Sequence, residues 1–274
     1  MKFNAYIKNW LLYGFLFAMA CIFLAPIVWT IMTSFKPTNN MFSLPPKLWV
    51  PGMGWQNYRS AFTVHQMHLA ILNSFATTAL QIFFTLLVSA LAAYPLAIMQ
   101  FPGRNAIFFA ILATMMIPQF GMVVPTFKVV ALLKLTNNYG GLVFPAAAAP
   151  FGVFLLRQYY MRLPKDFFDA GIVDGANQWT LWYKVALPLA KPALAALAIY
   201  TFTNAWKALL WPLLVLQKRE LVTLPIRLFF VMVGYNPDYA SLMAGSTIAI
   251  IVPVVFFLFF QSQFIEGLSG GVKG

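Results

Sequence analysis

The sequence has little charge, few acidic residues and a single cysteine. Of its 274 residues 9% are charged, whereas an ordinary soluble domain carries about 25%. This deficit indicates that most of the protein surface faces lipid. Cys21, within a hydrophobic run, is the only cysteine, which excludes a disulfide framework and a CxxC metal site.

The charges that are present are mostly basic and lie between the hydrophobic runs. The chain has 18 Lys and Arg against six Asp and Glu, a net charge of +12. Beside a membrane such residues set topology and contact lipid headgroups, so no nucleic acid is expected as a partner. No Gly-Lys dipeptide occurs, so the chain has no Walker A loop and is expected to bind no cofactor, ATP and Mg included.

Charge-free apolar runs predict six transmembrane helices. About 20 apolar residues cross the hydrocarbon core as a helix. The runs cover residues 9–35, 69–103, 105–127, 135–156, 192–206 and 239–265, and the fifth continues past Lys207 to 217. They predict an all-α polytopic membrane protein with one transmembrane domain over residues 1–274. The first run exceeds a signal-peptide core and has no small-residue cleavage site, so we expect it to remain as a helix.

Helix-breaking and polar residues within the runs are candidates for lining a translocation path. Pro118 and Gly121 interrupt the third run, which favours a helix that lines a path or bends there. Asn204 and Lys207 are the candidates in the fifth. A lysine inside a span is a functional-site candidate, and on a path it would favour an anionic or hydroxyl-rich substrate. The alternative is that Lys207 reaches an interface or pairs with a partner subunit.

The polar segment 164–190 holds half of all the acids, Asp166, Asp169 and Asp174. Its pattern predicts a helix over 165–173, a tight turn over 175–177 in which Gly175 has positive φ, and a second helix over 178–186. Such a segment can dock a soluble partner, although a plain interfacial helix pair fits the same pattern. Five basic residues near the helix ends in loop 157–191 indicate that this loop and both termini are cytoplasmic.

The segment DAGIVDGANQWTLWYKVALPLAKPAL resembles the EAA loop of ABC importer permeases. Asp169-Ala170-Gly171 corresponds to Glu-Ala-Ala, Gly175 to the glycine that follows, and Leu187-Pro188 to the end of the motif. Further blocks, from Asn73-Ser74 through Trp211-Pro212-Leu213 to Gly267-Leu268, resemble the carbohydrate-uptake permeases of the maltose-importer type. In two places the chain departs from the pattern. Gly171 lowers helix propensity by ~1 kcal/mol relative to alanine, and Lys207 stands where Asn or Asp is more usual.

The resemblance implies a type I importer permease in a bacterial or archaeal cytoplasmic membrane. Such a chain is not an enzyme. It works with a second permease, expected to form a heterodimer with it, with two ATPases that bind ATP and Mg, and with an external binding protein that delivers a sugar. The residues then expected to contact an ATPase are Asp166, Asp169, Ala170, Gly171, Asp174, Gly175, Leu187, Pro188 and, in the C-terminal tail, Lys273.

Other classes of protein fit less well. A secondary transporter or channel needs an internal repeat or ion-coupling acids at membrane depth, and no run contains an acid. A membrane enzyme needs carboxylates, a metal cluster or a nucleophile–base pair. His65 and His68 have no acid near them in the sequence, so they are more consistent with a solvated loop than with metal ligands. A purely structural protein leaves the EAA pattern unexplained.

Overall fold

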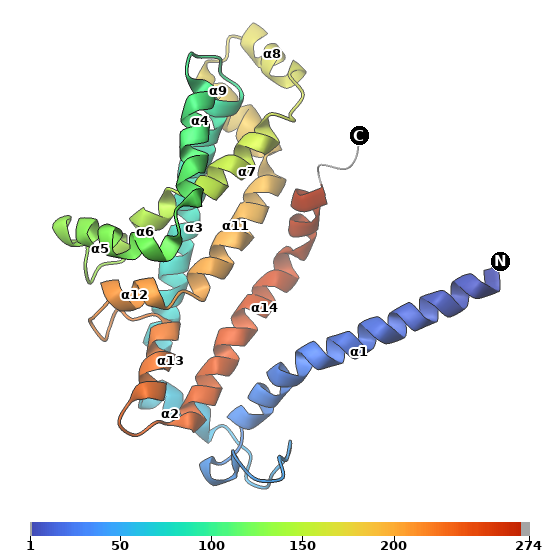
Figure 1. Ribbon diagram of the computed structural model, residues 1–274, viewed down its shortest axis with the longest axis vertical. Coiled ribbons are helices and arrows are strands. Elements are labelled where there is room, and N and C mark those ends of the chain that lie inside the picture. Colours follow the sequence, from blue (N-terminus) through green and yellow to red (C-terminus); the bar gives the residue numbers. More distant parts are fainter. Residues whose placement is uncertain (1, 270–274) are drawn as a thin grey trace. The chain divides into compact units, whose positions relative to one another are not determined.

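The computed structural model describes the backbone of residues 2–269 and the side chains of residues 9–261. Within these ranges the regular elements are helices, and none is a strand (Figure 1). The chain divides into two compact units. The first comprises Met1–His68 and Arg227–Val252, and the second comprises Leu69–Ile226 and Pro253–Gly274.

Three helices are each long and apolar enough to cross a membrane. The candidate spans are Asn9–Ser34, Met67–Ala97 and Tyr239–Gln261. They lie in α1 (Lys2–Ser34), α3 (Met67–Ala97) and α14 (Tyr239–Ser269). The first, second and sixth predicted spans are therefore confirmed as continuous helices.

The other three candidate spans are bent pairs of helices. Arg104–Met116 and Gln119–Leu132 meet at 95°, Gly140–Ala147 and Pro150–Tyr160 at 43°, and Gln178–Leu189 and Lys191–Trp206 at 74°. These pairs contain α4 (Arg104–Ala113), α5 (Val123–Leu132), α6 (Gly140–Ala147), α7 (Pro150–Tyr160) and α11 (Lys191–Trp206). Counting each pair as one span gives six, in agreement with the predicted all-α polytopic fold.

The third span is not the single helix that its apolar run suggested. Ile117 is extended, with ψ 123°, and Pro118 precedes a new helical turn. A proline disfavours the helical conformation of the residue before it and cannot donate a backbone hydrogen bond. The sequence thus located the break, but not its 95° angle.

The prediction that the fifth span continues past Lys207 to 217 is wrong. Helix α11 ends at Trp206 with Lys207 as its C-cap, and α12 (Leu210–Val215) begins separately. Pro212 explains the interruption, because in one continuous helix its nitrogen would have to donate a hydrogen bond to the carbonyl of Ala208.

Two further helices lie between the predicted spans. These are α2 (Gln56–Thr63) and α13 (Leu224–Val233). Helix α13 is apolar but has only ten residues, fewer than the roughly 20 that a straight crossing requires.

A polar cluster in the first unit corrects the expectation that the histidines have no acid nearby. His65 Nε2 lies 3.1 Å from Asp238 Oδ2, although the two are far apart in the sequence. Burial raises the pKa of Asp238, but hydrogen bonds from Ser241 and His65 outweigh burial and leave it below its ordinary value. Among the described residues no group of three or more His, Cys, Asp or Glu could hold a metal ion.

Close contacts between helices hold the second unit together. A Cβ atom at Gly152 in α7 would collide with Ser89 of α3 and lie 3.1 Å from Leu197 Cδ2 of α11. Gly152 itself is buried. The absence of a side chain at this position therefore allows three helices to approach one another.

Arg157 fastens the end of α7 to its neighbours. Its Nε donates to the Leu96 carbonyl at 2.9 Å, and its Nη2 donates to Asn105 Oδ1 at 3.4 Å. The guanidinium carbon lies 3.9 Å from the centroid of the Phe108 ring. One buried side chain thus connects α7 with the end of α3 and the start of α4.

We predict that Gly152→Ala destabilises the second unit by about 1–3 kcal/mol, because the added methyl group overpacks the contact with Ser89. Thermal inactivation of the purified protein in detergent measures the loss. Gly14→Ala is the control, since nothing lies within 4 Å of the Cβ position at Gly14. Equal thermal stability of the two variants would contradict the packing role of Gly152.

Candidate functional site

The helix–turn–helix predicted for the polar segment is present. Helix α8 (Asp166–Val173) and helix α9 (Gln178–Leu181) flank the turn. In Figure 1 both lie at the end of the second unit where α3 terminates. A π-helical turn, Trp182–Ala186, and α10 (Leu187–Leu189) then lead into α11. Movement of this segment would therefore act directly on a membrane-spanning helix.

Gly175 forms the turn after α8, as its position in the sequence predicted. Its φ is +81°, in the left-handed region that glycine adopts without penalty. The Gly175 amide donates to Ile172 O at 3.0 Å, and the Ala176 amide donates to Gly171 O at 2.9 Å. These bonds close the end of α8 in the manner of a glycine-capped helix. Nothing lies within 4 Å of the Cβ position at Gly175.

Asn177 has a role that the sequence analysis missed. Its Oδ1 accepts hydrogen bonds from the Thr180 amide at 2.9 Å and from Thr180 Oγ1 at 3.0 Å. Asn177 is thus the N-cap of α9 rather than only a turn residue. An asparagine directly before a helical run was the available signal.

Two apolar side chains anchor the segment to the core. Phe168 is 5% exposed and Leu181 is 1% exposed. A Cβ atom at Gly171 would lie 2.6 Å from Leu181 Cδ2, so the glycine lets α8 approach α9 closely. Gly171 was expected to soften the helix and to contact an ATPase. The structure shows that it also makes room for Leu181.

A hydrogen bond connects the start of α9 with α3. Tyr94 donates its hydroxyl proton to Gln178 Oε1 at 2.9 Å. The Tyr94 ring packs edge-on against Tyr160 of α7, with centroids 6.2 Å apart, and Tyr160 is fully buried. Sequence reasoning missed Tyr94 and Gln178, because no local pattern relates positions separated by 84 residues.

The outer surface of α8 combines acids with exposed apolar side chains. We call this surface the docking face; it comprises Asp166, Phe167, Asp169, Ile172, Val173 and Asp174. All six side chains are exposed, and Val173 is 86% exposed. Two of the acids lie in the first turn of α8, where the helix dipole favours negative charge. The docking face suits a soluble partner that offers basic and apolar groups together.

Of the remaining predicted site residues, only Ala170 lies on α8. Ala170 is exposed on α8, while Leu187 packs against the core and Pro188 is exposed on α10. Pro118 and Gly121 are exposed at the bend of the third span. Asn204 and Lys207 are exposed near the end of α11. Lys273 lies outside the described residues.

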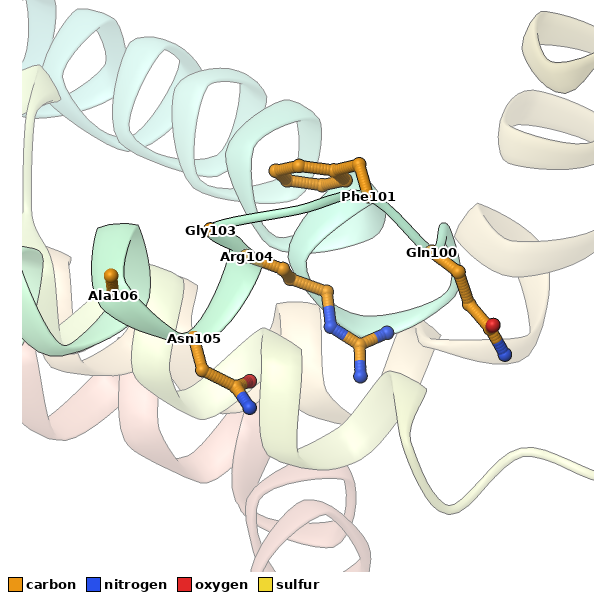
Figure 2. A pocket seen from close by; sticks show the side chains of 6 residues that line it. All are labelled: Gln100, Phe101, Gly103, Arg104, Asn105 and Ala106. Atoms are coloured by element: carbon orange, nitrogen blue, oxygen red, sulfur yellow. The ribbon is translucent and has the colours of Figure 1, made fainter.

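Figure 2 shows a pocket in the connection between α3 and α4. Its lining residues are Gln100, Phe101, Gly103, Arg104, Asn105 and Ala106. The Arg104 side chain donates from Nη1 to the Met99 carbonyl at 2.9 Å. None of the six lining side chains is an acid, a histidine or a nucleophile, so this pocket offers no catalytic chemistry.

Comparison with known proteins identifies the family. Residues 85–269 match the family described as binding-protein-dependent transport system inner membrane component. The chain belongs to this family. The permease is 37% identical over 273 residues to the arabinooligosaccharides transport system permease protein AraQ of Halalkalibacterium halodurans, covering 98% of each chain.

A second relative and a solved structure extend this finding. The diacetylchitobiose uptake system permease protein NgcG of Streptomyces coelicolor is 30% identical over 266 residues, covering 94% of this permease and 87% of that protein. A crystal structure of a bacterial ABC transporter involved in import of the acidic polysaccharide alginate contains a similar chain. This permease superposes on that chain with a TM-score of 0.83 at 23% sequence identity, and the superposition covers 95% of this permease and 97% of that chain. At that identity the likeness shows the fold, and the fold is that of an ABC importer permease.

We predict that Gly175→Val strains the turn by about 1–2 kcal/mol, because valine resists positive φ, and that it uncouples uptake from ATP hydrolysis. Gly175→Asn is the matched variant, since asparagine tolerates the left-handed region. Uptake and ATPase activity of the assembled transporter in liposomes distinguish the two. Normal uptake by the valine variant would show that the conformation of the turn is unimportant.

We also predict that Tyr94→Phe loosens the polar segment by about 1 kcal/mol, the usual contribution of one hydrogen bond. Hydrogen exchange of residues 164–190 measures the loosening. Tyr13→Phe serves as control, because Tyr13 is exposed on α1. Unchanged exchange in the Tyr94 variant would mean that Phe168 and Leu181 hold the segment without help from Gln178.

Proposed function

We propose that this permease forms half of the membrane pathway of an ATP-driven carbohydrate importer and couples to an ATPase through the docking face. One observation carries this proposal. Helix α8 buries Phe168 in the core while Phe167, Ile172 and Val173 remain exposed beside three acids. One side of α8 is thus anchored in the core, and the opposite side exposes apolar and acidic side chains. A helix of this kind can fit into a groove of another protein.

The route from the docking face to the membrane is short. The core contacts of Phe168 and Leu181 and the hydrogen bond from Tyr94 attach the segment to α3 and to the unit core. The segment then enters α11 across the 74° bend. Displacement of α8 by a moving ATPase would therefore be transmitted to two spans at once.

The distribution of charge supports a cytoplasmic location for the docking face. Arg157, Arg162, Lys165, Lys184 and Lys191 lie close to helix ends around the segment, where the positive-inside bias acts. With six spans both termini are then cytoplasmic as well. The ATPases that bind ATP and Mg, a second permease and an external binding protein complete the proposed assembly.

A carbohydrate is the substrate class that the relatives support. The printed names of the two relatives above refer to arabinooligosaccharides and diacetylchitobiose, and both relatives match along more than nine-tenths of this permease. Ion-driven transport has no support of this kind, because no acid lies within the described candidate spans.

We predict that Asp169→Ala weakens association with the ATPase about tenfold, since a charge-assisted hydrogen bond of about 1.4 kcal/mol is lost. Asp169→Glu should retain association, because the longer side chain keeps the charge. Co-purification of the ATPase with a tagged permease, titrated over ATPase concentration, measures the change.

Glu220→Gln is the control for Asp169, because Glu220 is an exposed acid outside the docking face. If the alanine and glutamate variants of Asp169 both behaved like the wild type, the acid would serve only the helix dipole. If no ATPase co-purified even with the wild type, the proposed function itself would fail.

A further inference from the structure

The loop between α1 and α2 is closed at its base by hydrogen bonds to the end of α1. The Gly54 amide donates to Phe35 O at 2.9 Å, and Asn57 Nδ2 donates to Ser34 O at 2.8 Å. Residues 37–53, which lie between these contacts, therefore leave α1 and return to the same place (Figure 1, blue, directly after α1). We call residues 37–53 the closed loop.

The closed loop lies at the ends of two candidate membrane spans. The span in α1 ends at Ser34, next to the residue that accepts the closing bond. The ring of Phe42 packs edge-on against Tyr239, with centroids 5.5 Å apart, and Tyr239 is the first residue of the span in α14. All these residues belong to the first unit. The closed loop is therefore held at the boundary between hydrocarbon and water.

Aromatic packing keeps the base of the closed loop rigid. The Phe35 ring lies 4.9 Å from the Trp55 ring and 5.2 Å from the Tyr58 ring, measured between centroids. The Tyr58 hydroxyl lies 2.8 Å from Ser34 Oγ and shares a hydrogen bond with it. The depth of the loop is thus tied to the end of α1, because these contacts prevent the loop from swinging away.

The closed loop buries some apolar side chains and exposes others. Met41 and Val50 are only 2% and 4% exposed. By contrast, Leu44 is 91% exposed and Trp49 is 68% exposed. The large apolar side chains that the loop exposes are Phe42, Leu44, Leu48 and Trp49. Large apolar side chains exposed together in this way mark a surface that meets a partner.

The composition of the closed loop indicates a lipid partner. Lys47 is its only charged residue, and the loop contains no acid. Lys47 is exposed and follows Leu44 closely in the sequence, just before Trp49. Tryptophan is enriched at the headgroup level of membranes. A lysine can bury its apolar stem there while its ammonium meets the negative surface of anionic lipids.

We propose that the closed loop is an interfacial anchor. Leu44, Leu48 and Trp49 enter the headgroup layer of the adjacent leaflet, and the Lys47 ammonium binds the phosphate of an anionic phospholipid. The anchor fixes the depth at which α1 leaves the membrane. This inference goes beyond transport and ATPase coupling, and it requires only that α1 spans the membrane. In the proposed topology the leaflet is the outer one.

The first test measures the depth of the closed loop in liposomes. In a Cys21→Ser background, which removes the native cysteine, Leu44→Cys, Val28→Cys and Arg59→Cys are introduced separately. The permease is purified with its accompanying subunits and labelled with a nitrobenzoxadiazole fluorophore. The lipid carries a nitroxide quencher just below the headgroup. Val28 is exposed within the span of α1, and Arg59 is an exposed charged residue of α2 that serves as the control for water.

The label at position 44 should be quenched about as strongly as that at position 28 and about fivefold more strongly than that at position 59, because apolar interfacial side chains lie at the depth of the quencher. Quenching at position 44 no stronger than at position 59 would overturn the proposal. A label at position 44 shielded from the lipid quencher and from aqueous iodide alike would also overturn it, since a protein would then cover the loop. Uptake and ATPase activity do not enter this measurement, so it separates failure of the anchor from failure of the proposed function.

The second test isolates Lys47. Adding phosphatidylglycerol to phosphatidylcholine liposomes should raise quenching at position 44 about twofold, because the anionic surface attracts the ammonium. Lys47→Gln should abolish this rise, and Lys47→Arg should retain it, since arginine keeps the charge. Lys218→Gln is the control, because Lys218 is an exposed cation outside the closed loop. A rise that persists in Lys47→Gln, or no rise with Lys47 present, would reject the phosphate contact.

Discussion

The structure depends first on the need of every backbone amide and carbonyl in lipid for a partner within the protein. That constraint makes each crossing a helix and makes each interruption costly. The bent spans are interrupted at three places: two lie at prolines, Pro118 and Pro150, and the third lies at Ala190. Because neighbouring helices must support each of them, the bent spans are also the places where the protein departs from a simple bundle.

The few charged side chains occupy distinct places in the structure. Three of the six acids belong to one exposed surface on α8, while Arg157 is buried and bound to the Leu96 carbonyl and to Asn105. A chain with so little charge thus places half of its acids on one exposed surface and buries Arg157 as a structural clamp.

Much of the fold and part of the candidate site could be predicted from the sequence. The apolar runs located the spans, and Gly175 marked the turn, because both signals are local. The break after Trp206 was missed although Pro212 was a local signal for it. Helix α13 was missed because tertiary packing decides whether a short apolar stretch forms a helix. The bond from Tyr94 to Gln178 and the pairing of His65 with Asp238 join residues far apart in the chain, so no local pattern revealed them.

The bond between Tyr94 and Gln178 has a consequence for how such permeases can be recombined. The polar segment 164–190 is fitted to the end of α3 by this bond and does not form a separate structural unit. If a chimaera received this segment from another permease without the matching residues of α3, the residue at position 178 would lack a fitting partner at position 94. Under the proposed function, a change of ATPase partner that alters the start of α9 would require a matching change near Tyr94.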